Sequence, residues 1–281
     1  MVGVFAYAGY YTLSRVFLKE EESDAVVYAV LFNVACTLIV GAYSLVNGFY
    51  LPDIAKYWPN IIVMGLLYAL AQVFIFQASK LTEASEVIII SSTRILWTIG
   101  AAVLFLDETF TIQKSIGAAL ILSAVTLVSY QKTKISNKNK SAISKGRIYT
   151  ILAGFCLGLG FVNDSYILKT ADATSYAALV FLVPTIMTVI IYRPGINKFK
   201  KLINKKLVRN SLILGVFYAI GIIASYTAYK SGGDASQIVP IGQSVVIITV
   251  LISVVFLSER KHLIQKMVGT VLVTVGVLLL I

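Results

Sequence analysis

Long runs of hydrophobic residues alternate with short polar segments along the whole chain. Each run is close to the roughly 20 apolar residues that a helix needs to cross a bilayer. Barrel strands, by contrast, alternate in hydrophobicity over about 10 residues. The pattern therefore predicts an all-α integral membrane protein with ten transmembrane helices. We expect these helices at residues 2–18, 26–46, 60–79, 85–106, 112–130, 147–168, 174–192, 208–229, 235–257 and 264–281.

An internal repeat divides the chain into two parts of similar length. The segment Gly65–Ala69 recurs as Gly215–Ala219, and the pair Ala84-Ser85 recurs as Ala235-Ser236 at nearly the same offset. Five is an odd number, so two five-helix repeats in one chain cross the membrane in opposite directions. Inverted repeats of this kind are typical of secondary transporters, with the substrate site between the halves near the midplane.

The repeat sets the domain organisation that we expect. Residues 1–131 form the first five-helix half, residues 132–146 a basic cytoplasmic linker, and residues 147–281 the second half. Two near-degenerate packings of such halves would give alternating access.

Composition supports a membrane location and argues against an enzyme. The 281 residues are 58% hydrophobic and 13% charged, whereas soluble domains carry about 25% charged residues. Ten spans leave no room for an extramembrane catalytic domain. The sequence contains no recognisable catalytic triad, metal cluster or phosphate loop, so we expect no enzymatic activity and no cofactor.

The distribution of basic residues predicts the orientation. Most of the 24 lysines and arginines fall on one face, chiefly in the loops 131–146 and 193–209. By the positive-inside rule these loops are cytoplasmic, and both termini then lie outside the cell membrane. The net charge of +11 is accounted for by these loops, which meet anionic headgroups, so no nucleic-acid partner is expected. We expect a monomer in the lipid bilayer.

Two matched sets of residues carry a family resemblance. The segment Ala235–Pro240 and the helix end at Leu257–Arg260 are similar to the EamA-type family of the drug/metabolite transporter superfamily. The other residues of the resemblance are Gln265, Gly269 and Gly276 in the second half and Ala84, Ser85, Asp107, Glu108, Gln113 and Gly117 in the first. The resemblance implies ten helices, a central cavity lined mainly by the first four helices of each half, and transport of small metabolites or drugs.

The chain departs from the pattern of that family in two ways. Pro240 has Ile89 as its counterpart in the first half. The charge bias also points to outward termini, whereas many relatives have the opposite orientation, so the direction of transport stays open.

Arg94 is the most informative single residue, because it lies near the middle of the fourth expected span. A guanidinium at the bilayer centre costs about 2.5–3.5 kcal/mol on insertion scales, so it should face a wet cavity or a partner. It either grips a carboxylate-bearing substrate with its forked donors or forms an ion pair inside the bundle. Asp164, in the sixth span, is the natural partner. Asp164 could instead serve as a proton or cation site, or merely cap a helix.

Aromatic and amide side chains form a second group of candidates, because binding pockets favour aromatic walls with a few polar anchors. Aromatic belts at the membrane interface are the competing explanation. The complete candidate binding set is Arg94, Asp164, Gln72, Trp97, Tyr11, Asn163, Tyr218 and Gln243.

Four further features have structural explanations. Gly154 and Gly158 form a small-residue face that lets helices approach closely. Arg15 is expected to extend to the headgroups, Glu86 to meet Lys80 or water, and Glu259 to cap a helix or lie at the interface.

These observations favour a secondary transporter for small metabolites, with an exporter of amino acids or related amphipathic compounds as the leading expectation. Its partners are a small-molecule substrate, the bilayer and a coupling proton or ion. The alternative is a proton-coupled exporter of cationic drugs, for which Asp164 would supply the buried carboxylate.

Overall fold

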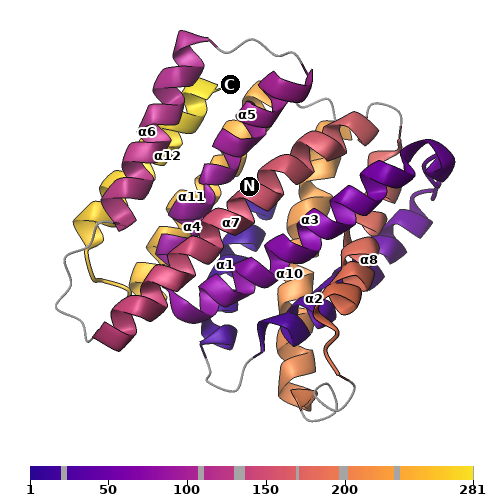
Figure 1. Cartoon of the computed structure of the whole chain (residues 1–281), viewed down its shortest axis with the longest axis horizontal. Coiled ribbons are helices and arrows are strands. Elements are labelled where there is room, and N and C mark those ends of the chain that lie inside the picture. The colour runs from indigo at the N-terminus through magenta and orange to yellow at the C-terminus, as the bar shows by residue number, and fades with distance from the viewer. Residues whose placement is uncertain are drawn as a thin grey trace.

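The structure is a computed structural model that describes residues 1–19, 24–106, 111–129, 137–168, 171–195, 202–230 and 235–280. Within these ranges every regular element is a helix (Figure 1). The helices of the first half are α1 (Val2–Leu18), α2 (Ala25–Val46), α3 (Ile54–Leu81), α4 (Ala84–Ser91), α5 (Thr93–Leu106) and α6 (Ile112–Ser129). Those of the second are α7 (Asn137–Leu168), α8 (Ala173–Tyr192), α10 (Lys205–Lys230), α11 (Ala235–Phe256) and α12 (Leu263–Leu280).

Eight helical stretches of the described chain are long and apolar enough to cross a membrane. They are Ala25–Val46, Ile54–Leu81, Ala84–Phe105, Ile112–Ser129, Ser141–Leu168, Ser175–Tyr192, Lys205–Ser225 and Leu263–Leu280. Helix α1 has 17 residues, and the part of α11 whose side chains are described in full, Ser244–Phe256, is apolar as well. The protein is therefore a multi-pass membrane protein.

The fourth expected helix, 85–106, is divided at Ser92 into α4 and α5. The amide of Ser92 donates to the carbonyl of Ile89 at 3.2 Å, which tightens the last turn of α4. The hydroxyls of Ser91 and Ser92 both donate to the carbonyl of Ile88, at 2.9 and 3.3 Å. Serine side chains compete with the helical backbone in this way, and the interruption places Arg94 in the first turn of α5.

Helix α7 also differs from expectation, because it begins at Asn137 rather than near 147. The last part of the predicted linker, 137–146, is therefore helical. Several helices begin where an aspartate satisfies free backbone amides. Asp24 caps α2 through the amides of Val26 and Val27, and Asp172 caps α8 through the amide of Ser175.

Helices of the two halves pack on each other in a paired pattern. Helix α3 packs on α7 and α8, and α10 packs on α1 and α2. Helices α6 and α12 run side by side at one edge of the bundle (Figure 1). There a Cβ atom on Gly117 would meet the carbonyl oxygen of Gly276 at 2.6 Å. Only glycine permits such close contact of two helices.

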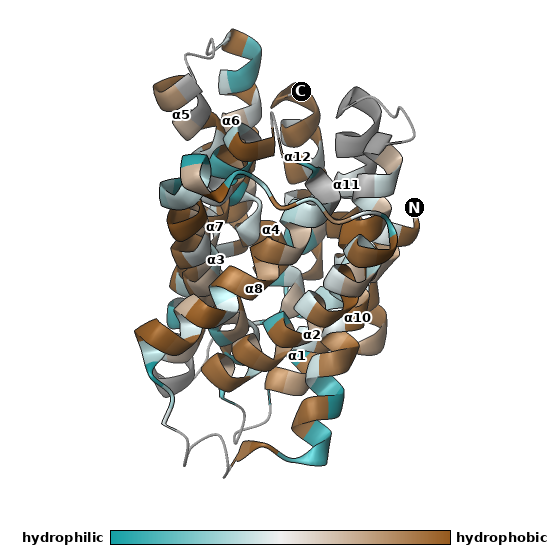
Figure 2. Ribbon diagram, turned by 90° about the vertical axis from the view of Figure 1, so that its right-hand side faces the viewer, coloured by the Kyte–Doolittle hydropathy of each residue, from teal (hydrophilic) through white to brown (hydrophobic). Residues whose placement is uncertain are grey.

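Hydropathy follows the long axis of the helices. Figure 2 shows hydrophobic residues along most of the helix lengths, with many of the hydrophilic ones near helix ends. Large apolar side chains are exposed on the outside of the bundle, among them Leu104, Phe105 and Phe256. Exposed apolar surface on this scale is suited to lipid rather than water.

Candidate functional site

A cavity of about 270 Å³ lies inside the bundle, where helices of the two halves meet. It receives side chains from α1, α2, α3 and α5 of the first half and from α7, α8 and α10 of the second. Five of the eight candidate residues line it: Arg94, Asp164, Gln72, Tyr11 and Tyr218. Sequence positions far apart thus meet at one place in the membrane interior.

The backbone of Arg94 is held by two glycines of α7. A Cβ atom on Gly154 would meet the hydroxyl of Thr93 at 2.6 Å, and one on Gly158 would meet the carbonyl oxygen of Arg94 at 2.6 Å. Any larger residue at these positions would push α5 away from α7. The packing role expected for this glycine pair is confirmed, and this packing fixes the position of Arg94.

The guanidinium of Arg94 lies 5.9 Å from the ring centroid of Phe161. Among the residues that the structure describes, none gives this guanidinium a hydrogen bond or an ion pair, and Asp164 is not within 4.0 Å of it. Within the described structure these donors are therefore available to an acceptor that enters the cavity.

Asn33 of α2 is a cavity residue that sequence reasoning missed. Its side chain is 3% exposed, and its Nδ2 atom has no hydrogen-bond partner in the described structure. A buried donor without a partner is costly and is explained most simply by a ligand that supplies the acceptor. A lone asparagine within the apolar run 25–46 was the available signal.

Asp164 is held by two tyrosines. Tyr68 of α3 donates its hydroxyl hydrogen to Oδ2 at 2.5 Å, and Tyr176 of α8 donates to Oδ1 at 2.6 Å. Tyr176 is fully buried. The carboxyl group of Asp164 therefore joins α7 to a helix of the first half and to a helix of its own half.

Aromatic rings form part of the cavity wall. The ring centroid of Tyr218 lies 4.8 Å from that of Tyr10 and 5.9 Å from that of Phe181. Gln72 donates from Nε2 to the hydroxyl of Tyr10 at 2.9 Å, which fixes its side chain against this wall. Tyr11 lies edge-on to Tyr10, with centroids 5.2 Å apart. Such a wall suits an apolar or amphipathic portion of a ligand.

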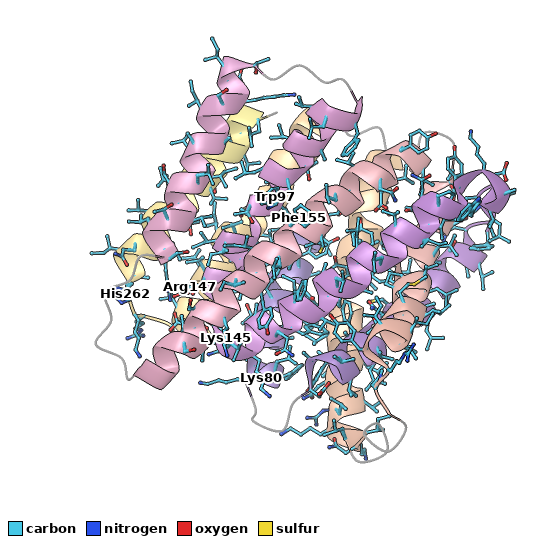
Figure 3. The ribbon with its side chains drawn as sticks, in the orientation of Figure 1. Lys80, Trp97, Lys145, Arg147, Phe155 and His262 are labelled. Atoms are coloured by element: carbon cyan, nitrogen blue, oxygen red, sulfur yellow. The ribbon has the colours of Figure 1, made fainter. Side chains whose placement is uncertain are left out.

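The other three candidates do not line the cavity as described. Trp97 is 41% exposed and packs edge-on against Phe155 on the outside of the bundle (Figure 3). Asn163 exchanges hydrogen bonds with Asn60, at 2.7 and 3.0 Å, and lines an outer groove between α3, α5 and α7. The side chain of Gln243 lies outside the described residues.

A polar network lies at one end of the bundle, which we call the basic end (Figure 3 labels Lys80, Lys145, Arg147 and His262 there). Glu259 accepts hydrogen bonds from the amides of Ala84 and Ser85 and from the hydroxyl of Ser85. Its expected capping role is thus confirmed, and the helix that it caps belongs to the other half.

Lys266 strengthens the same contact between halves. Its side chain is fully buried, forms an ion pair with Glu83, and donates to the carbonyl of Glu259 at 3.0 Å. Burial raises the pKa of Glu259, and the hydrogen bonds from Ser85 and Ala84 offset only part of that effect.

Two expectations at this end are corrected. Glu86 pairs with Arg147, with Nε and Oε2 3.0 Å apart, rather than depending on Lys80 or water. Arg15 donates to the carbonyls of Ser79 and Lys80 at the end of α3 rather than extending to headgroups. Free carbonyls at a helix end attract cations, and neither partner was evident from sequence spacing.

The family follows from a comparison of the sequence with family models. The model described as EamA-like transporter family matches residues 1–130 and again residues 144–281. The chain belongs to the EamA-like transporter family. The cavity is therefore the interior of a membrane transporter of the drug/metabolite type.

Individual proteins are also similar to this chain. An uncharacterized protein of Methanocaldococcus jannaschii is 34% identical over 103 residues, which are 36% of this EamA-like chain and 73% of the relative. A protein of known crystal structure matches 99% of the chain and 95% of its own length, with a TM-score of 0.60 and 14% identity. That likeness shows a shared fold.

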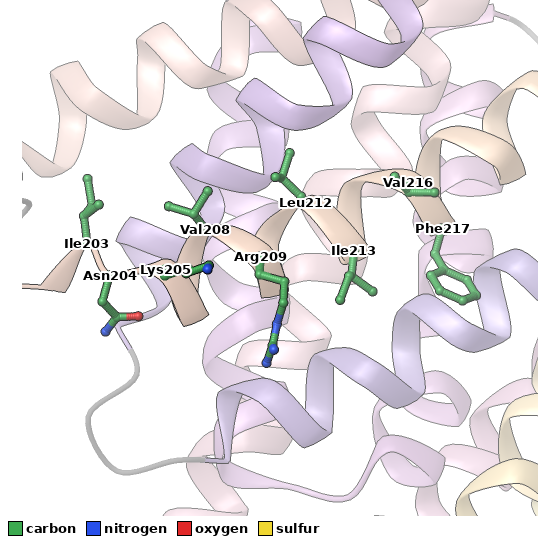
Figure 4. A pocket seen from close by; sticks show the side chains of 9 residues that line it. All are labelled: Ile203, Asn204, Lys205, Val208, Arg209, Leu212, Ile213, Val216 and Phe217. Atoms are coloured by element: carbon green, nitrogen blue, oxygen red, sulfur yellow. The ribbon is translucent and has the colours of Figure 1, made fainter.

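A larger groove, of about 690 Å³, runs along α10 on the outside of the EamA-like bundle (Figure 4). Its described lining comes from α10 and the residues just before it, with Lys205 and Arg209 toward one end and Val216 and Phe217 toward the other. This groove lies on the outside of the bundle, whereas the interior cavity lies between the halves and holds Arg94 and Asp164, so the interior cavity is the better candidate.

Proposed function

We propose that this chain is a secondary transporter that exports amino acids or related carboxylate-bearing, amphipathic metabolites across the cytoplasmic membrane by alternating access. One observation carries the proposal: Arg94 lines an interior cavity, and the described residues give its guanidinium no partner. An intramembrane cation without an internal partner is a functional site by default.

The chemistry of the cavity supports this substrate class. The forked donors of Arg94 match a carboxylate, and the free Nδ2 of Asn33 adds a neutral donor to the same cavity. The rings of Tyr10, Tyr218 and Phe181 suit the side chain of the substrate. Contact with these rings favours amphipathic compounds over small inorganic anions, because only the former have an apolar part that can bind there.

Ten spans in two inverted halves remain part of the proposal. The packing of α3 on α7 and α8 has its counterpart in the packing of α10 on α1 and α2. A Cβ on Gly9 would meet Phe217 at 2.6 Å, and one on Gly160, its counterpart in the second half, would meet Tyr68 at 2.7 Å. The archaeal relative is about half as long as this chain, which is the length of one repeat.

In the proposed orientation the basic end faces the cytoplasm and both termini face outward. The network of Glu259, Lys266 and Arg147 then closes the cytoplasmic side. A buried cluster of Tyr57, Met64, Ile167 and Tyr176 closes the other side. Each closure joins residues of both halves, as alternating access requires.

Exchange of radiolabelled amino acids in proteoliposomes tests the proposal. Hydrogen bonds to a charged group contribute about 1.5–3 kcal/mol, so Arg94→Gln should weaken carboxylate binding by about 10- to 100-fold. Arg209→Gln, a matched change in the outer groove, should have no such effect. Equal affinities for the amino acid in wild type and in folded Arg94→Gln would refute the proposal.

A proton-coupled exporter of cationic drugs is the second candidate. Asp164 favours it, because this carboxyl group lines the cavity without an ion-pair partner among the described residues. Uptake of a cationic dye by the same proteoliposomes distinguishes the two. Dye transport that survives Arg94→Gln and is lost in Asp164→Asn would favour the drug exporter.

A further inference from the structure

We propose that Asp164 is the site of the coupling proton, and that its charge controls a hydrogen-bonded latch between the two halves. The inference rests on the proposed function in so far as the proton drives that transport. It goes further by naming the coupling ion and the residues that bind it.

The latch consists of three side chains from three helices. Tyr68 and Tyr176 each donate a hydroxyl hydrogen to a different oxygen of Asp164. The contact with Tyr68 crosses between halves, because α3 belongs to the first and α7 to the second. Ionised carboxylates accept hydrogen bonds at both oxygens and donate none. The geometry therefore fits the anion, and the anion holds the halves together.

A proton on Asp164 would disturb this arrangement. A protonated carboxyl group gains an O–H donor on one oxygen. If that oxygen is Oδ2, its bond to Tyr68 either reverses, which leaves the hydroxyl hydrogen of Tyr68 in need of another acceptor, or persists as a bond to a neutral and weaker acceptor. The described residues offer Tyr68 no second hydrogen-bond partner. Protonation thus weakens the contact between α3 and α7.

The latch lies where such a change could open the transporter. Tyr176 belongs to the buried cluster with Tyr57, Met64 and Ile167, and Tyr68 packs against it. This cluster closes the end of the bundle opposite the basic end. Asp164 itself faces the substrate cavity. Loss of the bond between Tyr68 and Asp164 leaves the Asn60–Asn163 bonds as the remaining hydrogen bonds between α3 and α7 in the described structure, and it therefore loosens the wall between the cavity and that end.

The surroundings of Asp164 favour a proton over a metal cation. No group of three or more His, Cys, Asp or Glu side chains that could hold a metal is found in the described part of the chain. Each oxygen of Asp164 already accepts a phenolic hydrogen. A sodium ion needs several oxygens that converge with free lone pairs, as hard cations do generally.

The ionisable groups around Asp164 are few. Tyr68 faces it from α3 and Tyr176 from α8, while Arg94 of α5 and Tyr218 of α10 line the same cavity. Arg147 of α7 forms an ion pair with Glu86 of α4, so their charges neutralise each other. They lie about 25 Å away along α7, at 1.5 Å per residue. Tyr57 and Lys56, farther along α3, contact each other.

Arg94 links the proton to the substrate. A carboxylate-bearing substrate held by Arg94 lies in the cavity that Asp164 also lines. An ammonium group on the substrate would compete with the proton for Asp164. Substrate binding in the cavity therefore changes the proton occupancy of Asp164 without direct contact between Arg94 and Asp164.

Infrared difference spectroscopy between acidic and alkaline samples tests proton binding directly, on the reconstituted full chain and without any substrate. Wild type should show a carboxylic-acid band that titrates between about pH 4 and 8, the range in which perturbed carboxyl groups titrate. Asp164→Asn should lose part of this band, and the part that remains belongs to other buried carboxyl groups such as that of Glu259. Asp53→Asn, a matched change at the exposed cap of α3, should keep the whole wild-type band.

Tyr68→Phe provides a second variant if Asp164→Asn does not fold. It should move the midpoint of this titration to higher pH, because the anion loses one donor. It should also raise the rate at which a water-soluble thiol reagent labels a cysteine placed at Ile167. A band of full wild-type amplitude in Asp164→Asn, or an unchanged midpoint in Tyr68→Phe, would overturn the inference.

Transport separates this inference from the proposed function. One proton exchanged per amino acid should give about tenfold accumulation per unit of pH gradient, and pyranine trapped in the vesicles should report the proton. Amino-acid exchange without proton movement would support the proposed function and overturn the inference. A titrating band in a protein that exchanges no amino acid would support the inference and overturn the proposed function. Sodium-driven accumulation would also overturn the inference.

Discussion

Gly158 of α7 lies so close to Arg94 of α5 that a Cβ atom at Gly158 would stand 2.6 Å from the carbonyl oxygen of Arg94. The same Cβ atom would stand 2.6 Å from the Cβ of Trp97. Both obstacles belong to the first turns of α5 and cannot rotate away as a flexible side-chain end could. The position of the cavity's guanidinium therefore depends on the absence of a side chain on the neighbouring helix.

Gly158→Ala should displace Arg94 and destabilise the fold. Overpacking of a well-filled contact costs about 1–3 kcal/mol, so we expect a lower melting temperature and a weaker apparent affinity for a carboxylate substrate. Thermal unfolding and exchange kinetics measure the two effects.

Gly100→Ala is the matched control, since a Cβ atom there has nothing within 4 Å. Alanine is favoured over glycine inside a helix by about 0.5–1 kcal/mol, so this variant should be as stable as wild type or slightly more so. A Gly158→Ala protein that behaves like Gly100→Ala would show that α5 has room to move.

The apolar runs predicted most of the helices, because a bilayer imposes the same length requirement on each run. Residues 85–106 are a different case. Their pattern is that of one span, yet Ser91 and Ser92 bond to the backbone and divide it. Serine is compatible with a continuous helix as well, so composition alone could not distinguish the two outcomes.

The site was predictable only in part, for a related reason. Arg94 and Asp164 stood out because charge is expensive in lipid, whatever surrounds it. Tyr68 and Asn33 did not, because tyrosine is common at membrane interfaces and an asparagine in a span commonly hydrogen-bonds to a neighbouring helix. Their importance depends on the residues of the other half that pack near them in the folded protein. Trp97 was predicted to line the binding site because it lies near the middle of its span. Depth in the membrane does not indicate which side of α5 faces lipid.

Asn33→Leu should weaken carboxylate binding without loss of stability. The free Nδ2 of Asn33 contributes no hydrogen bond in the described structure, so an apolar residue of similar volume removes a burial cost rather than a contact. A neutral hydrogen bond to substrate contributes about 0.5–1.5 kcal/mol, which corresponds to a loss of affinity of about 2- to 10-fold.

Asn163→Leu should give the opposite result. Its amide is bonded to Asn60 outside the cavity, so stability should fall by about 1–3 kcal/mol while affinity stays the same. Equal losses of stability in the Asn33 and Asn163 variants would assign Asn33 a structural role.

Glu259 should make the stability of the protein depend on pH. Burial raises its pKa, so the folded protein binds more protons than the unfolded chain between the ordinary glutamate value, about 4.3, and the raised one. Stability therefore falls as the pH rises through this interval. The melting temperature, followed from pH 4 upward, should decline in wild type, and the decline should be smaller in Glu259→Gln.

The exposed cap variant Asp53→Asn should keep the wild-type dependence. If the melting temperature of Glu259→Gln falls with pH as steeply as that of wild type, another group is responsible. Glu259→Gln should also be less stable throughout, because an amide cannot accept all three hydrogen bonds from Ala84 and Ser85.

The pair of Glu86 and Arg147 joins the halves at the basic end, and a double-mutant cycle measures its contribution. The side chain of Glu86 is 5% exposed and that of Arg147 is 17% exposed. Arg147→Gln leaves a nearly buried carboxylate without its partner, which costs about 3–5 kcal/mol for a fully buried pair and less here because Arg147 is partly solvated. Arg147 also donates to the carbonyl of Ser129 at 2.5 Å.

Glu86→Gln with Arg147→Gln should therefore be more stable than Arg147→Gln alone, since the unpaired charge is gone. The double variant should nevertheless open the basic end more readily, because neutral amides hold the halves less firmly than an ion pair. Labelling of a cysteine at Ile89 by a water-soluble thiol reagent, added from the cytoplasmic side, reports that opening. Additive losses of stability with unchanged labelling would mean that the pair neither couples the two residues nor closes the cavity.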